Sequence, residues 1–303
     1  MNAPARLALF VAAVAGLGAA AFGAARALDG PSGEADRSAT TAAGTGPGCA
    51  AYRDAPPAAA LTFRQGPVRL EPLTGPVPAG AAAPYRFRLE GLPSSLETTP
   101  GEPPLHLIVI RRDLAHFQHL HPEPAADGAW ATPLTLPEPG VYRVITDFAV
   151  CGRRAALGVD LAAPGPFSPA PPPPSPIRAP AGYEAALTVD GSALRFRLAY
   201  EGQPVTDLEP YLGHQAHLVA LREADLAYVH AHPKEQDGNE ASGPGVELDV
   251  AFPTADPYRL FLEVSHRGRV PVFEVRLEAQ PAGAAPPSPG HGGDSGDSGD
   301  DHG

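Results

Sequence analysis

Methionine, cysteine and basic residues are scarce in this chain. Met1 is the only methionine among 303 residues, so the thioether side chains of a methionine-rich copper(I) site are missing. Only 22 residues are Lys or Arg, and they are spread along the chain, which argues against a nucleic-acid-binding surface. Long helical runs of Glu, Lys, Ala and Leu are also missing. With 39 Pro, 33 Gly and 43% apolar residues, the composition indicates a turn-rich, all-β protein.

Charge is absent from residues 7–25, directly after Arg6. This 19-residue run is long enough to cross a bilayer as a helix, and Ala25-Arg26-Ala27 fits a signal peptidase site. Residues 1–28 are therefore predicted to be either a retained single-pass transmembrane anchor or a cleaved signal. Both alternatives export the bulk of the chain. We expect an extracytoplasmic protein held in the cell membrane or, alternatively, secreted.

The two cysteines, Cys49 and Cys151, are expected to meet an oxidising compartment after export. Their simplest state there is a single disulfide that closes a loop of about a hundred residues. A free thiol, or a metal ligand at Cys151, is the alternative. A blue-copper centre needs a cysteine with two histidines, and only Cys151 could supply it.

Composition divides the rest of the chain. Residues 29–48 have almost no large apolar side chains and are predicted to be a flexible tether. Residues 164–181 contain a polyproline stretch and are predicted to be an extended linker. Residues 281–303 form a His/Asp/Gly tail predicted to be disordered. Two segments of domain size remain, 49–163 and 182–280.

These two segments share three sequence blocks in the same order. The blocks are YRFRLEG at Tyr85 with LRFRLAYEG at Leu194, HLIVIRRDLAHFQHLHP at His106 with HLVALREADLAYVHAHP at His217, and VYRVITDFAVCGRR at Val141 with PYRLFLEVSHRGRV at Pro257. Matched order at similar spacing indicates a tandem repeat. The blocks are short, rich in β-branched and aromatic residues, and bounded by Pro, Gly or Asp, as strands are. We expect two antiparallel, immunoglobulin-like β-sandwiches.

One histidine pattern occurs in each repeat: a histidine, twelve residues, and then His-x-His-Pro. Imidazoles two residues apart on a strand point to the same face, so each pattern can offer several nitrogen ligands to one ion. Such sites suit Cu(II) or Zn(II). The histidines are His106, His119 and His121 in the first repeat and His217, His230 and His232 in the second.

The twelve residues between His106 and His119 predict the strand register of the hairpin. In a hairpin whose even-length loop is centred on residues 113–114, His106 faces His121 and His119 faces Ile108, so the three imidazoles share one face. An odd-length loop would place His106 on the opposite face.

The second copy follows the same rule, with a loop centred on residues 224–225. It places His217 opposite His232 and His230 beside Val219. His214 and His266 are further candidate ligands near this copy, and they favour the second repeat as the metal site.

A structural role is the main alternative for all these histidines. The predicted histidine face is otherwise apolar, so the imidazoles could also lie at the rim of a core, bonded to carbonyl or carboxylate oxygens, and recur only because the domain was duplicated. The apolar residues are Ile108, Ile110 and Phe117 in the first copy and Val219, Leu221 and Tyr228 in the second.

Catalytic motifs are not found in the sequence. It has no G-x-S-x-G, no H-E-x-x-H and no phosphate-binding glycine loop. We therefore expect a protein that is not an enzyme, and a redox or hydrolytic activity at the histidines is the weakest alternative.

Residues 194–222, LRFRLAYEGQPVTDLEPYLGHQAHLVALR, resemble the extracytoplasmic immunoglobulin-like domains of the FixH/YtkA-like and CopC-like type. The Gly202-Gln203-Pro204-Val205 turn and the strand from His217 carry the similarity. The exported part is also similar to actinobacterial proteins that have one N-terminal membrane helix and the same His-x-His-Pro block. The resemblance implies a β-sandwich and a role in handling copper or another heavy metal.

Together these patterns predict a membrane-anchored protein that binds or buffers a transition metal, most readily copper and otherwise zinc, through the His-x-His-Pro hairpins. Its expected partners are the membrane and metal-handling proteins of the cell envelope, and nucleic acid is not among them. The alternative is a scaffold or interaction protein of the envelope whose histidines are structural.

Overall fold

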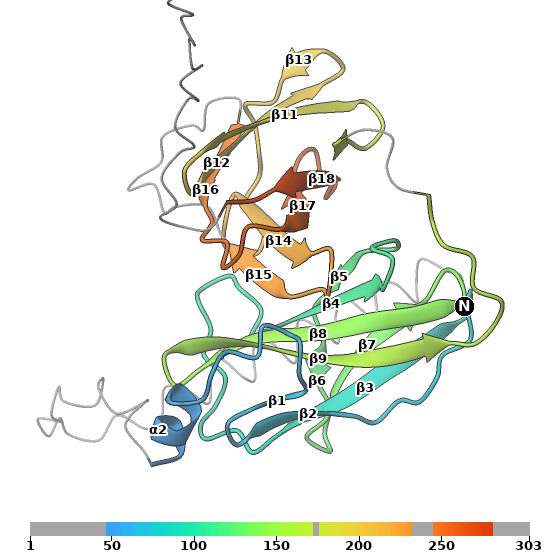
Figure 1. The fold of residues 1–303 in the computed structure, drawn as a ribbon, viewed down its shortest axis with the longest axis vertical. Coiled ribbons are helices and arrows are strands. Elements are labelled where there is room, and N and C mark those ends of the chain that lie inside the picture. Colours follow the sequence, from blue (N-terminus) through green and yellow to red (C-terminus); the bar gives the residue numbers. More distant parts are fainter. Residues whose placement is uncertain (1–46, 172–175, 232–244, 281–303) are drawn as a thin grey trace, which may run out of the picture. The chain divides into compact units, whose positions relative to one another are not determined.

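The computed structural model describes residues 47–171, 176–231 and 245–280 (Figure 1). The predicted membrane or signal segment, most of the tether and the tail lie outside these ranges. Within them the regular secondary structure is antiparallel strands apart from one short helix, which confirms the predicted all-β class. Among these residues, no helix has both the length and the apolar character needed to cross a membrane.

The first repeat is a sandwich of two antiparallel sheets. Residues from both sheets share one core, which includes Tyr85, Phe87, Leu107 and Phe148. One sheet has the order β1 (Arg64–Gln65), β2 (Val68–Pro72), β3 (Ala82–Glu90), β7 (Trp130–Thr135) and β6 (Glu123–Pro124). The other has the order β5 (Gln118–Leu120), β4 (Leu105–Arg111), β8 (Gly140–Val150) and β9 (Arg153–Ala163).

The second repeat has the same plan around its own core, which includes Leu194, Phe196, Leu218 and Leu262. One sheet has the order β10 (Ile177–Arg178), β18 (Val272–Glu278), β17 (Pro257–Val264), β14 (Ala216–Arg222) and β15 (Tyr228–Ala231). The other joins β11 (Tyr183–Asp190), β12 (Ala193–Tyr200) and β13 (Gln203–Pro204), with β16 (Gly245–Asp249) also on β12. The order β15-β14-β17-β18 repeats β5-β4-β8-β9, as expected for a tandem repeat.

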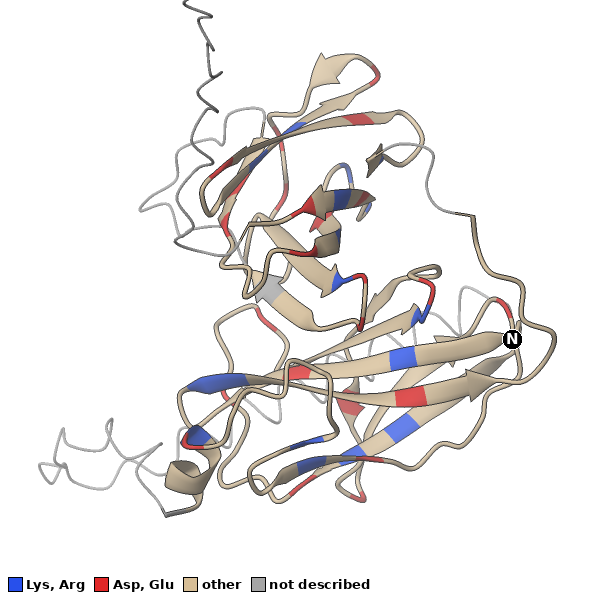
Figure 2. Ribbon diagram, in the orientation of Figure 1, with Lys and Arg blue, Asp and Glu red and all other residues tan. Residues whose placement is uncertain are grey.

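Strand β3 has one solvent-exposed face and one buried face because its side chains alternate. Tyr85 and Phe87 are fully buried, whereas the side chains of Arg86 and Arg88 are 40% and 36% exposed. Successive residues of a strand point to opposite faces, so this pattern places the aromatic rings in the core. Figure 2 shows acidic and basic residues interspersed along the strands. Exposed pairs such as Arg86–Asp127, at 2.7 Å, are screened by solvent and do not decide the fold.

Two local features differ from the sequence prediction. Residues Pro47–Arg53 form a short helix, α2, where a tether and the start of a strand region were expected. Cys49 of α2 is joined to Cys151 by a disulfide with a Cα–Cα distance of 5.5 Å, and this bond holds the helix against the first sandwich. The predicted linker, residues 164–181, also contains a strand, because β10 pairs with β18.

Strand β4 is buried on both faces. Its odd-numbered apolar residues, such as Leu107, belong to the core of the first sandwich. Ile108 and Ile110 point the other way, into a third cluster that includes residues of the second repeat. We call this the inter-repeat cluster; its buried members are Ala60, Ile108, Ile110, Leu114, Ile145, Ala156, Val219, Leu221, Leu226, Tyr228 and Phe261.

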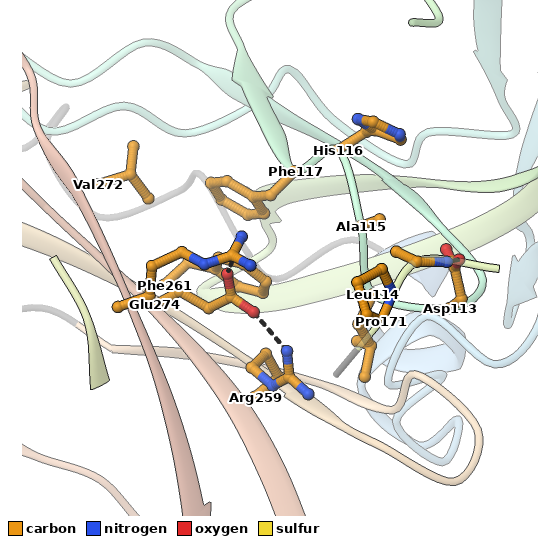
Figure 3. A pocket seen from close by; sticks show the side chains of 12 residues that line it. Asp113, Leu114, Ala115, His116, Phe117, Pro171, Arg259, Phe261, Val272 and Glu274 are labelled. Carbon is orange, nitrogen blue, oxygen red and sulfur yellow. Dashed lines mark hydrogen bonds and ion pairs between the residues drawn. The ribbon is translucent and has the colours of Figure 1, made fainter. Parts of the chain in front are cut away.

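The inter-repeat contact is reciprocal. Phe117 of the first repeat stacks on Phe261 of the second, with ring centroids 4.1 Å apart (Figure 3). Tyr228, which corresponds to Phe117, in turn donates a hydrogen bond of 2.9 Å to Asp147 of the first repeat. Equivalent hairpins thus reach across to equivalent strands, β17 and β8, as in the self-complementary interface of a symmetric dimer. A cavity of about 460 Å³ lies beside the stacked rings.

Candidate metal centre

The β4–β5 hairpin has the register predicted from the sequence. Leu107 pairs with Leu120 and Ile108 pairs with His119, so the loop is even and centred on residues 113–114. His106 and His119 therefore lie on the same face of the hairpin as Ile108. This face points toward the second repeat and not into the core of the first sandwich.

His106, His119 and His121 come together, and we call them the histidine cluster. Among the described residues, their possible ligand nitrogens all lie within 4.8 Å of one another. His106 Nδ1 is 2.9 Å from His119 Nε2. The ring of His121 is 5.4 Å from that of His106 and 4.8 Å from that of His119, centroid to centroid. Nitrogens that bind one ion at about 2 Å lie roughly 3–3.5 Å from one another. The His121 ring therefore has to move by about 1–2 Å to share an ion with His106 and His119.

Two carboxylates determine which nitrogens face the centre of the cluster. Glu102 lies 3.3 Å from His106 Nε2, which leaves His106 Nδ1 toward His119. Glu263, on β17 of the second repeat, binds His119 Nδ1, which leaves His119 Nε2 toward His106. Carboxylate–histidine pairs of this kind fix the tautomer and ring orientation of metal-binding histidines.

His121 is the third imidazole of the histidine cluster. Its Nε2 is buried and has no hydrogen-bond partner among the described residues. Burial, together with smaller contributions from the neighbouring His119 and His106, lowers the pKa of His121 to about 3. The imidazole is therefore neutral at physiological pH, which is the form that binds metals.

A second layer of ion pairs supports Glu102. Its hydrogen bond with His106, aided by Arg154, holds the pKa of Glu102 well below its usual range, although burial opposes the shift. Arg154 lies 3.1 Å from Glu102 and 3.3 Å from Asp147, and Asp147 accepts the hydrogen bond of Tyr228. Glu102, which contacts His106, is thus connected through Arg154 and Asp147 to Tyr228 of the inter-repeat contact.

The second copy has the predicted register but contributes differently. Val219 pairs with His230, as expected. The side chain of His230 and all of His232 lie outside the described part of the chain. His217 is fully buried, and its ring lies 5.6 Å from His106 and 5.9 Å from His119. The structure therefore brings His217 to the cluster of the first repeat.

The two further candidates lie at different places. His214 neighbours His217, with ring centroids 5.5 Å apart. His266 is buried elsewhere: Tyr183 Oη lies 2.8 Å from its Nδ1, and Asp207 lies 3.1 Å from its Nε2. His266 does not belong to the group of converging nitrogens found among the described residues.

Glu102, Glu263 and Asp147 were not predicted as part of the site. Asp147 and Glu263 occupy matching places in the third sequence block, in ITDFAV and LFLEV. Each is a single acidic residue within an apolar run, and a buried carboxylate needs a partner. That pattern was the available signal. Glu102 lies in a loop, where the sequence offers no comparable signal.

Residues 183–281, which include β11 through β18, match a family described as a domain of unknown function, DUF8832. No curated protein matches the chain. The resemblance to FixH/YtkA-like and CopC-like domains stays a prediction.

Several solved structures are similar to the chain. A mutant of Salmonella alpha-2-macroglobulin is 14% identical, with a TM-score of 0.25; the match covers 73% of this chain and only 15% of the Salmonella chain. A chimeric titin Z1Z2 tandem is 13% identical over 71% of this chain and 98% of its own, with a TM-score of 0.20. Tandem Ig repeats of Dlar are 7% identical over 71% and 96%, also with a TM-score of 0.20. Similarity at this level does not extend to function.

Proposed function

We propose that this protein binds or buffers a transition-metal ion, Cu(II) or Zn(II), at the histidine cluster. The observation that carries the proposal is the convergence of three imidazole nitrogens within 4.8 Å. Two of the rings are oriented by carboxylates, and the third has a buried nitrogen without a hydrogen-bond partner among the described residues. Neutral imidazoles suit both ions. The resemblance of residues 194–222 to copper-associated domains makes copper the first ion to test.

A location outside the cytoplasm is part of the same proposal. The Cys49–Cys151 disulfide is typical of proteins outside the cytoplasm. The apolar run at residues 7–25 would carry the chain there and, if retained, would anchor it to the membrane. We propose an extracytoplasmic protein with two immunoglobulin-like repeats, working beside other metal-handling proteins of the envelope and without catalytic activity of its own.

The competing function is an envelope scaffold whose histidines are structural. One observation favours it: the carboxylates of Glu102 and Glu263 already hold the His106 and His119 rings in place within the protein. In that case the cluster would hold the repeats together without an ion. The two functions differ in whether metal raises stability, because an ion that binds only the folded state stabilises it.

Changing His119 and His121 to alanine is expected to weaken metal binding at least about 100-fold, because two of three ligands are lost and loss of even an orienting partner costs 10–100-fold. The purified full chain, with His291 and His302 of the tail changed to alanine, is titrated with Cu(II) and Zn(II) against a chromophoric chelator.

The matched control changes His230 and His232 to alanine. Affinity is expected to stay near that of the parent chain, because these residues belong to the other hairpin. Equal affinity in the parent and in the His119/His121 variant would exclude the cluster as the site. Binding that vanishes only in the control would move the site to the second hairpin.

Glu263→Gln is expected to lower metal affinity by about 10-fold, because a neutral amide orients His119 less strongly than a carboxylate does. The Cu(II) electron paramagnetic resonance spectrum should also change, since a positioning residue alters the ligand field. Glu247→Gln, at an exposed acid paired with Arg195, is the control. A variant that loses thermal stability but keeps both the affinity and the spectrum would show a purely structural role for Glu263.

A further inference from the structure

His217 belongs to the second repeat but lies against the histidine cluster of the first. It is on β14, where its register partner is Glu263, and its side chain is fully buried. It shares its face of β14 with Val219 and Leu221 of the inter-repeat cluster. The sequence had assigned His217 to a site within its own hairpin.

The ring spacings fit one shared ion. With metal–nitrogen bonds of about 2 Å, two imidazoles on one tetrahedral ion have ring centroids roughly 5 Å apart. Within the cluster the three spacings are 5.1, 5.4 and 4.8 Å. His217 extends the same set, at 5.6 Å from His106 and 5.9 Å from His119. His217 is not in the group of nitrogens that lie within 4.8 Å of one another, so its ring would have to move toward an ion held by the other three. Structural zinc sites have four ligands, and His217 is the histidine placed to supply the fourth.

We propose that His217 is the fourth ligand, so that one ion is shared between the two repeats and fastens them together. This inference rests on the proposed function. The first repeat supplies His106, His119 and His121, and the second supplies His217 as a ligand and Glu263 as the acid that orients His119. The full ligand set exists only when the repeats are docked, so the ion stabilises the docked arrangement.

Packing alone is the alternative role for His217. Its ring also lies 5.4 Å from Tyr211 and 5.5 Å from His214, both at steep angles. A ring held only by such contacts could be replaced by another aromatic ring without effect on an ion. His217→Phe keeps a ring of similar size and removes the nitrogens, so it separates the two roles.

The test measures Cu(II) and Zn(II) affinity of the purified full chain by chelator competition. We expect His217→Phe and His217→Ala to lower affinity about 10–100-fold and to remove one nitrogen from the Cu(II) magnetic resonance spectrum. His266→Ala, at another buried histidine of the same repeat, should leave both unchanged. At saturating metal, hydrogen exchange at β14 should slow in the parent chain and not in His217→Phe, whereas exchange at β5 should slow in both.

Unchanged affinity and an unchanged spectrum in His217→Phe, with tight binding in the parent chain, would overturn the shared site and leave the proposed function standing. A parent chain that binds neither ion would overturn the proposed function and the inference together. If His217→Ala fails to fold, His217→Phe alone gives the decision.

Discussion

Removing the Cys49–Cys151 disulfide is expected to lower the free energy of unfolding of the first sandwich by about 2–5 kcal/mol. The bond joins residues 102 positions apart, so in the reduced chain the unfolded state regains the conformational freedom of a long loop. Both cysteines are buried, so alanine is the better replacement, because serine would bury a hydroxyl. Trp130 is the only tryptophan and lies on β7, so its fluorescence in urea follows this sandwich.

Reduction of the unmodified chain by dithiothreitol is the control for the alanine variants. It should shift the urea midpoint by the same amount as the double substitution. A midpoint that reduction does not move would show that the crosslink adds no stability. Two reactive thiols in the unreduced protein would show that the bond does not form.

Asp147→Ala is expected to lower the free energy of unfolding by about 2–4 kcal/mol, mainly through Tyr228. Asp147 is 1% exposed and accepts the hydroxyl of Tyr228, which is buried in the inter-repeat contact. Burial, with a further contribution from Asp147, raises the pKa of Tyr228 far above its usual value, so this hydroxyl keeps its proton and needs an acceptor. The pair with Arg154 adds less, since that side chain is 40% exposed and also bonds Glu102.

A double-mutant cycle with Tyr228→Phe identifies the source of this cost. In the phenylalanine background no hydroxyl is left without an acceptor, so Asp147→Ala should cost about 1–3 kcal/mol less than in the parent chain. Asp160→Ala, at an acid 42% exposed on the next strand, should cost under about 1 kcal/mol. Equal costs of Asp147→Ala in the two backgrounds would exclude Tyr228 as the cause.

Local features of the fold followed from the sequence. The alternation in YRFRLE predicted the two faces of β3, and the twelve-residue gap predicted the pairing of Ile108 with His119. Both depend on neighbours in the chain or across one hairpin, where the period of a strand fixes the outcome. The helix at Pro47–Arg53 was missed because seven residues carry too little periodicity.

The meeting of the two repeats did not follow from the sequence. The apolar residues Ile108 and Ile110 of β4 are compatible with the rim of their own core as well as with a contact to another domain, because burial against a partner and burial in a core give the same sequence pattern. Residues 107–110, LIVI, nevertheless have no polar side chain on either face of the strand, unlike residues 85–90, YRFRLE. A strand that is apolar on both faces has to be covered on both sides. The position of His217 beside the histidine cluster becomes clear only once the second repeat is seen to cover this face of β4.

The linker between the sandwiches has a consequence for how the protein behaves on dilution. Thirteen residues separate the end of β9 at Ala163 from the start of β10 at Ile177. A short tether makes docking of the repeats intramolecular, at an effective concentration of about millimolar. A symmetric dimer of single repeats would come apart as the protein is diluted. Here the formation of the inter-repeat contact is independent of protein concentration.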